Sequence, residues 1–207
     1  MRSEKTGENA GALSEYLDRP VRADARRNLQ TLLKTAMSVF ATSGVDAPMR
    51  QIAEQAGVGV GTIYRHFPKR ADLIVAVFRH EVDACADAAS ALAAERQPGE
   101  ALTRWVDLYI DLIAAKRGLA AALHSGDPAY QGLPTYFEDR LSPALDVLLK
   151  AASAAGHVRS DVNALDLLWA IASLCAPTRT GDPVLARRMI GLVLDGLRAG
   201  PSASVGK

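Results

Sequence analysis

Residues 51–67, QIAEQAGVGVGTIYRHF, contain the most informative pattern in the chain. Apolar residues continue from Met49 at i, i+3, i+4 and i+7, which predicts a helix of about two turns. Gly57 ends that helix, because glycine readily adopts the left-handed conformation that turns the chain. Ile63 and Phe67 lie four residues apart and predict a second short helix with both side chains facing inward. Two short helices joined in this way are typical of a helix-turn-helix, whose second helix enters the major groove of DNA.

The helices on either side are predicted from apolar periodicity and from the glycine or proline residues at their ends. Before this stretch, apolar positions between Leu29 and Phe40 predict a helix from about Ala23 to Ser43. After it, a long helix is expected to begin at Ala71. Further helices are expected at about 99–116, from Pro143 with Ser142 as N-cap to Gly156, from the N-cap Asp161 to about Ala176, and from Pro183 to Gly200.

The chain is expected to be all-α. Its 207 residues are 49% hydrophobic and 23% charged, which is ordinary for a globular protein and excludes general disorder. No run of alternating β-branched residues predicts a strand. We expect a flexible tail at residues 1–22, followed by a helix-turn-helix DNA-binding domain of three helices at 23–70. A helical-bundle domain for effector binding and dimerisation is expected at 71–200, and a second flexible tail at 201–207.

The net charge of +1 hides an uneven distribution. Residues 19–70 carry nine Lys or Arg against three Asp or Glu, a net charge of +6, whereas residues 71–207 sum to −3. A basic module on a mildly acidic body suggests that one part of the protein meets phosphate, although a solvated basic face would show the same charge.

Cysteine usage and hydropathy indicate in which cellular compartment the protein is expected. Cys85 and Cys175 show no CxxC spacing, which fits a reducing cytoplasm better than a disulfide-held secreted fold. The chain shows no basic leader followed by an apolar segment, and its longest apolar stretch is too short to span a bilayer. We therefore expect a cytoplasmic protein with no membrane partner.

The run from Ala36 to Phe78 resembles the TetR family of transcriptional regulators. The resemblance rests on Ile52-Ala53, Ala56-Gly57-Val58, Gly61-Thr62-Ile63-Tyr64, His66-Phe67 and Leu73. The rest of the chain is similar to that family in length and helix order only. The resemblance implies a homodimer that places two recognition helices in successive major grooves of double-stranded operator DNA. It also implies that a small-molecule effector in the C-terminal domain changes their separation and releases the operator.

The same resemblance implies which residues face DNA. Thr62, Tyr64 and His66 are expected to contact phosphates or bases, with Val60, Gly61 and Arg65 facing the groove. Arg65 is the best candidate for bidentate recognition of a guanine; a phosphate contact without sequence preference is the alternative. Arg70 stands where the family usually has a phosphate-binding lysine, and Gly59 where it often has a capping serine. The expected DNA-binding set is Arg50, Val60, Gly61, Thr62, Tyr64, Arg65, His66, Lys69 and Arg70.

The C-terminal half is expected to hold the effector and the dimer interface. An apolar pocket with a few polar anchors is typical of small-molecule sites, although aromatic residues at helical spacing more often form core. His124 is the best candidate for a polar anchor, but a histidine satisfied within the structure is the more common case. The expected pocket residues are Trp105, Tyr109, Leu112, Leu123, His124, Tyr136, Phe137 and Trp169. Excess apolar surface on the last two helices predicts a dimer interface from Leu165, Trp169, Ala172, Met189, Ile190, Val193, Leu194 and Leu197.

Other classes of site find little support. The four histidines show no paired spacing with each other or with cysteine, so we expect no metal site. No nucleophile motif or Gly-rich phosphate loop is present, so we expect neither a cofactor nor an enzyme. The alternatives are a ligand-independent regulator or an activator of the same fold and, more remotely, a small helical carrier or enzyme. The sequence does not identify the effector, the operator or the direction of control.

Overall fold

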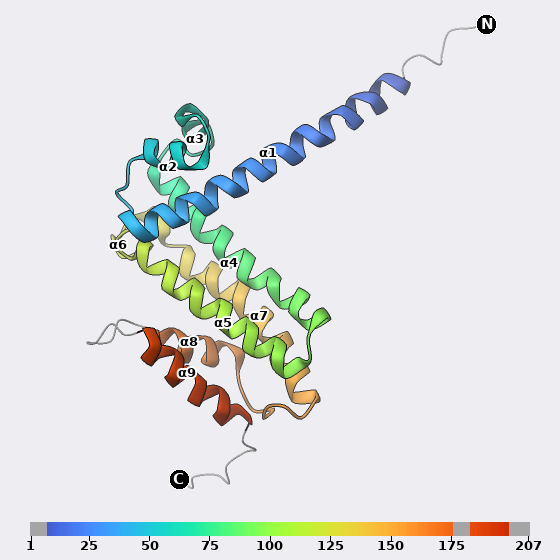
Figure 1. Ribbon diagram of the computed structural model, residues 1–207, viewed down its shortest axis with the longest axis vertical. Coiled ribbons are helices and arrows are strands. Elements are labelled where there is room, and N and C mark those ends of the chain that lie inside the picture. Colours follow the sequence, from blue (N-terminus) through green and yellow to red (C-terminus); the bar gives the residue numbers. More distant parts are fainter. Residues whose placement is uncertain (1–7, 176–182, 199–207) are drawn as a thin grey trace, which may run out of the picture.

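The computed structural model describes residues 8–175 and 183–198, and within these ranges the chain forms helices and no strand, which confirms the all-α expectation (Figure 1). The expected C-terminal tail at 201–207 and the first seven residues lie outside the described ranges. The helices are α1 (Glu8–Ser43), α2 (Met49–Ala56), α3 (Val60–His66), α4 (Arg70–Glu95), α5 (Pro98–Lys116), η1 (Arg117–Leu119), α6 (Ala120–Leu123), η2 (Pro128–Tyr130), α7 (Leu133–Ala154), α8 (Ala164–Leu174) and α9 (Pro183–Arg198).

The helices form a small N-terminal unit at one end of a bundle. Figure 1 shows α2 and α3 beside the C-terminal part of α1, while α4 runs from this end into the bundle with α5 and α7. Helices α8 and α9 lie next to each other on the side of the bundle away from α2 and α3. Among the helices described, none has both the length and the apolar character needed to cross a bilayer.

Aromatic residues fill the centre of the bundle. Trp105 and Tyr109 on α5 are fully buried, and their rings stack with centroids 5.7 Å apart. The ring of Phe137 on α7 lies 5.9 Å from that of Tyr109. Burial of one such large apolar side chain stabilises the folded state by roughly 1.5–3 kcal/mol, so this cluster holds α5 against α7.

Helix α1 is longer than the sequence pattern predicted. It begins at Glu8 and continues through Pro20, so residues 8–22, which the sequence pattern assigned to an irregular tail, are helical in the structure. Figure 1 shows the N-terminal part of α1 extending away from the bundle. Apolar periodicity marks only the part of a helix that packs against a neighbour, and for this reason it detected α1 only from about Ala23.

Helix α7 begins earlier than expected. It starts at Leu133 with Pro134 in its first turn, and Pro143 lies in its interior rather than at its start, so the predicted cap at Ser142 is wrong. An interior proline typically costs roughly 3 kcal/mol, because it removes a helical hydrogen bond and crowds the preceding turn. Pro143 is on the exposed side, while Leu141 and Leu145 are fully buried. Packing of the opposite face therefore outweighs the local proline signal.

The N-cap of α8 is Asn163 rather than the expected Asp161. The Asn163 side-chain oxygen accepts hydrogen bonds from the backbone N–H groups of Leu165 (2.8 Å) and Asp166 (3.1 Å). Asp161 instead pairs with the guanidinium of Arg159, which keeps the pKa of its carboxyl below the usual value. Both residue types cap helices well, and the position of the first helical turn decides between them.

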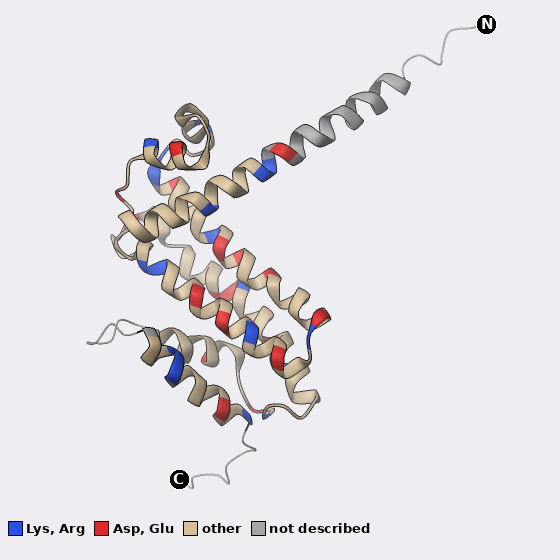
Figure 2. Ribbon diagram, in the orientation of Figure 1, with Lys and Arg blue, Asp and Glu red and all other residues tan. Residues whose placement is uncertain are grey.

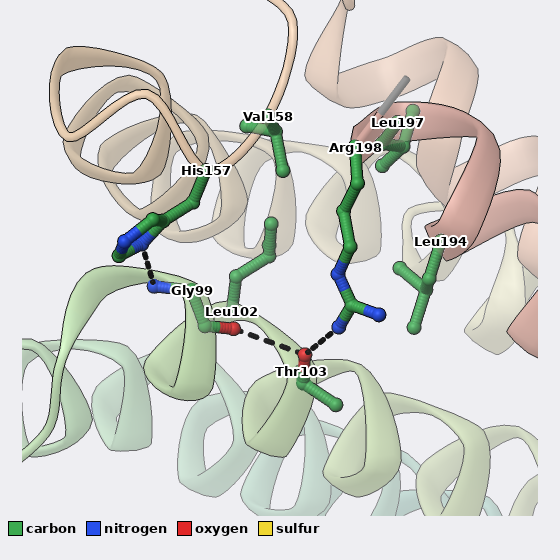
Figure 3. A pocket seen from close by; sticks show the side chains of 8 residues that line it. All are labelled: Gly99, Leu102, Thr103, His157, Val158, Leu194, Leu197 and Arg198. Atoms are coloured by element: carbon green, nitrogen blue, oxygen red, sulfur yellow. Dashed lines mark hydrogen bonds between the residues drawn. The ribbon is translucent and has the colours of Figure 1, made fainter.

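The start of α5 contacts both the turn after α7 and the C-terminal end of α9. The backbone N–H of Gly99 donates to Nδ1 of His157 (3.0 Å), and Arg198 donates to the hydroxyl of Thr103 (3.4 Å) (Figure 3). Leu194 and Leu197 line the same contact, which encloses a pocket of only about 10 Å³. A space of this size holds at most one water, so it is not an effector site.

Candidate functional site

The turn between α2 and α3 has the predicted geometry. Gly57 follows α2 with φ +68°, and the N–H of Val58 donates to the carbonyl oxygen of Ala53 (3.0 Å). Gly59 is extended and precedes α3 without a side-chain hydrogen bond. The predictions of α2, of its stop at Gly57 and of a short α3 are confirmed.

Gly57→Ala is expected to destabilise the protein by roughly 1–2 kcal/mol, because an alanine in the left-handed conformation brings its Cβ close to the following carbonyl oxygen. A Cβ at Gly57 would meet no other atom within 4 Å, so backbone strain is the whole effect. Urea unfolding measures the difference. Gly61→Ala in α3 is the control; its Cβ is equally free, and it is expected to stabilise the helix slightly. Wild-type stability in Gly57→Ala would contradict the role of this turn.

The two faces of α3 have opposite environments. Ile63 is completely buried and Phe67, just after the helix, is 8% exposed. Tyr64 is 51% exposed, Val60 is 42% exposed, and Arg65 is also exposed. The buried pair holds the helix against the N-terminal unit, so the outward face presents one aromatic, one apolar and one cationic side chain from a rigid element. The exposed set further contains Gly61 and His66, while Thr62 is half-buried.

Basic side chains surround this outward face. Arg50 on α2 and Lys69 just before α4 are exposed, and neither Arg65 nor Lys69 forms an ion pair with any described residue. Arg50 pairs with Glu54 (2.8 Å), and this hydrogen bond raises the pKa of its guanidinium. Acidic residues instead concentrate on the bundle helices α4 and α5 (Figure 2). The unpaired Arg65 and Lys69 are therefore available for phosphate or base contacts.

The Arg70 side chain, expected to contact phosphate, also forms hydrogen bonds within the protein. Its Nη1 donates to the backbone carbonyl oxygens of Val45 and Ala47 (2.5 and 2.8 Å) in the loop between α1 and α2. The side chain is only partly exposed and ties that loop to the start of α4. Lys69 next to it remains the candidate for a phosphate contact.

A pocket of about 310 Å³ opens in the bundle near the N-terminal unit. This volume is at the lower end of the roughly 300–1,000 Å³ that small-molecule sites occupy. It includes four of the residues predicted for the effector site, Leu123, His124, Phe137 and Trp169. Its full lining is Phe78, Ile113, Lys116, Leu123, His124, Tyr130, Leu133, Pro134, Phe137, Trp169 and Ala172.

Four other predicted pocket residues do not line this pocket. Trp105 Nε1 donates to the carbonyl oxygen of Cys85 (2.8 Å), and the Tyr109 hydroxyl donates to that of Leu168 (3.1 Å), so both are satisfied core residues. The Tyr136 hydroxyl donates to Asp83 (2.6 Å), and its ring lies under Arg79. Leu112 borders a separate open groove between α4 and α5. Helical periodicity reports that a side chain faces inward, not whether it meets a cavity.

Lys116 and Tyr130 are the polar pocket residues that sequence reasoning missed. Lys116 follows Ile113 by three residues, so both lie on one face of α5; a lysine on that apolar face was the available signal. Tyr130 lies in η2, within a loop rich in helix breakers that the sequence pattern marked only as irregular.

Exposed apolar side chains remain on α8 and α9. Trp169 is 50% exposed, Met189 37% and Leu192 70%, and Leu192 was missing from the predicted interface. Ile190 and Leu197 are buried inside the chain, so their assignment to a dimer interface is wrong. Every third or fourth residue of α9 faces the bundle. The number of apolar residues in the helix does not show which of them face the bundle and which face outward. Partly buried members of the predicted set are Leu165, Ala172, Val193 and Leu194.

The cysteines and the metal-binding residue types form no further site. Burial raises the pKa of Cys85 to about 12, which keeps its thiol protonated and unreactive. Within the described ranges, no three His, Cys, Asp or Glu side chains lie together in a group that could hold a metal ion.

Two family models match this chain. Residues 32–77 match the model described as bacterial regulatory proteins, tetR family, and residues 97–199 match that of the SbtR-like transcriptional regulator C-terminal domain. HTH-type transcriptional regulators from Staphylococcus aureus are 38% identical over 64 residues, which are 30% of this chain and 35% of theirs. The chain thus matches about a third of the length of these curated relatives.

Solved structures extend the similarity over most of the chain. A TetR transcriptional regulator from Streptomyces coelicolor is 40% identical, with a TM-score of 0.70, over 84% of this chain and 98% of that one. A TetR transcription regulatory protein from Mycobacterium vanbaalenii is 36% identical, with a TM-score of 0.68, over 87% of this chain and 100% of that one. The helix-turn-helix geometry, the matched models and these two structures agree that the chain is a member of the TetR family of DNA-binding transcriptional regulators, and not an enzyme.

Proposed function

We propose that this regulator is a homodimeric repressor that binds a palindromic operator through α3 and releases it when a small molecule enters the pocket. The main observation in support of this proposal is that α3 has two different faces. Ile63 is buried on one face, and Arg65 is exposed on the other and forms no ion pair with any described residue. A rigid helix with its polar face free is what insertion into a major groove requires.

The contacts with DNA divide into two kinds in this proposal. Arg65 recognises a guanine through two parallel hydrogen bonds, and Val60 and Gly61 allow close approach to the bases. Thr62, Tyr64 and His66 contact phosphates or bases, with Arg50 and Lys69 adding phosphate contacts that carry no sequence information. We place the boundary between the DNA-binding and effector units at residues 70 and 71, where α4 leaves the helix-turn-helix.

The segment after α5 supports a route from the pocket to α1. Lys116, Leu123 and His124 line the pocket, and η1 lies between them in the chain. On one side η1 contacts α1, where Gly118 approaches the backbone of Phe40 and Ala41. A ligand that shifts η1 would therefore also move α1 and the recognition helix α3. This movement would couple the effector pocket to the DNA-binding surface.

The dimer in this proposal uses the exposed face of α8 and α9. Trp169, Met189 and Leu192 are exposed apolar side chains on two adjacent helices, and a symmetric partner would bury them. Two recognition helices related by a two-fold axis then match two half-sites of a palindrome. Because the operator lies on chromosomal DNA, we place the regulator in the cytoplasm, where its two unbridged cysteines stay reduced.

Fluorescence anisotropy with DNA from the gene's own upstream region tests this function. Arg65→Ala is expected to lower operator affinity roughly 10- to 100-fold, because a bidentate guanine contact contributes about 1–3 kcal/mol. Arg104→Ala is the control, since Arg104 is an exposed arginine on α5 without an ion pair to any described residue. Equal, weak binding of every duplex, unchanged by Arg65→Ala, would refute sequence-specific recognition by α3. A salt series separates phosphate contacts from base contacts.

A further inference from the structure

The effector pocket contains one charged anchor in an otherwise apolar wall. Among its lining residues in the described part of the chain, Lys116 is the single lysine or arginine, and there is no aspartate or glutamate. Phe78, Ile113, Phe137 and Trp169 supply the apolar surroundings. A cation with no acid beside it gives the pocket a positive potential that an apolar core does not need.

Lys116 is held in the pocket by aromatic faces rather than by an ion pair. Its Nζ lies 5.0 Å from the ring centroid of Phe137 and 5.6 Å from that of Phe78. No described carboxylate lies within ion-pair distance of this ammonium group. Burial lowers the pKa of Lys116, which means that its charged form has lost solvation and would gain from a counter-ion.

Two further polar groups border the same space. Tyr130 is 8% exposed, and its hydroxyl forms no hydrogen bond with any described residue. Nδ1 of His124 lies 2.8 Å from the carbonyl oxygen of Ala120, which orients the imidazole ring. A carboxylate accepts charge-assisted hydrogen bonds and therefore suits a site that offers an ammonium group.

We propose that the effector is a compact amphipathic carboxylate, in which an aromatic or alicyclic body lies among Phe137, Trp169 and Ile113 and the carboxylate pairs with Lys116. This inference rests on the proposed role of the pocket as the effector site. The pocket volume of about 310 Å³ suits a body of one or two rings rather than a long acyl chain.

Direct binding of matched probes tests the ligand class. Each carboxylate is compared with its neutral amide and its amine: 3-phenylpropionate, 3-phenylpropionamide and 3-phenylpropylamine, and the corresponding cyclohexyl compounds. Trp169 lines the pocket and Trp105 is completely buried, so quenching of tryptophan fluorescence reports occupancy in the full-length protein. The carboxylates are expected to bind roughly 10- to 100-fold more tightly than the amides, because a charge-assisted hydrogen bond replaces a neutral one.

Substitution of Lys116 identifies the source of the preference. Lys116→Met is expected to remove the preference for carboxylate while leaving amide binding in place, and Lys116→Arg to retain it. Arg104→Met on α5 removes the same charge outside the pocket and is expected to change nothing. Retained amide binding also shows that Lys116→Met still folds.

Three results would overturn the inference: equal binding of carboxylate and amide by the wild-type protein, a preference that survives in Lys116→Met, or no binding of any probe at millimolar concentration. Operator anisotropy without ligand is measured separately. Loss of specific DNA binding there would refute the proposed repressor, whereas a Lys116-dependent carboxylate site that does not release DNA would refute only the coupling.

Discussion

Replacing Trp169 and Leu192 together by aspartate is expected to yield monomers and to lower operator affinity at least about 100-fold. In a symmetric dimer each substitution occurs twice, so four large apolar side chains would be lost from the interface. Burial of each contributes roughly 1.5–3 kcal/mol, and four buried carboxylates add a desolvation cost. Sedimentation equilibrium measures the association state, and anisotropy measures the binding of the full palindrome.

Val147→Asp is the matched control for this prediction. Val147 on α7 is 55% exposed, close to the value for Trp169, but lies outside α8 and α9. It is expected to leave both the dimer and its operator affinity unchanged. A double variant that remains fully dimeric would exclude this face as the interface. Because Trp169 also borders the proposed effector pocket, these measurements are made without ligand.

The second large effect is expected at Gly118. A Cβ added there would lie 2.6 Å from the carbonyl oxygen of Phe40 and 2.7 Å from Cα of Ala41. Both atoms belong to the backbone of α1, so no side-chain rotation can relieve the contact, and η1 must separate from α1. Overpacking of this kind typically costs roughly 1–3 kcal/mol, which we expect Gly118→Ala to lose in free energy of unfolding.

Gly118→Ala is also expected to weaken operator binding without any ligand, because it displaces α1 in the way we propose for the effector. Thermal unfolding and anisotropy on the same preparation measure the two effects. Gly132→Ala is the control, since a Cβ at Gly132 meets nothing within 4 Å. A folded Gly118→Ala protein with wild-type operator affinity and a wild-type ligand response would show that this contact does not position α1.

Arg117 and Arg70 form hydrogen bonds that could contribute to the proposed coupling between the pocket and the helix-turn-helix. Arg117 donates from Nη2 to the carbonyl oxygen of Cys175 (2.5 Å), which connects η1 to the end of α8. Arg70 connects the start of α4 to the loop before α2. In the proposed coupling, these hydrogen bonds to the backbone would help to pass a movement of the pocket wall on to η1 and to the loop before α2.

The sequence alone determined the helix-turn-helix and the outward residues of α3. Gly57, Gly59 and the spacing of Ile52, Ile63 and Phe67 are local signals, because they act through the backbone conformation of one residue or through neighbours within two turns of helix. The structure confirmed α2, α3 and the exposure of Arg65 for this reason. Whether those residues touch DNA stays a prediction.

The tertiary structure alone decided what the inward-facing residues of the bundle do. Trp105 and Phe137 are both buried, yet only Phe137 borders the pocket. Pro143 lies inside α7 because packing of the opposite face outweighs a local cost. Lys116 became a candidate ligand anchor only when α4 and α7 brought two aromatic rings to it. Apolar periodicity predicts on which side of a helix a side chain lies. Whether that side chain meets a cavity, an interface or a charged group depends on which other part of the chain packs against it.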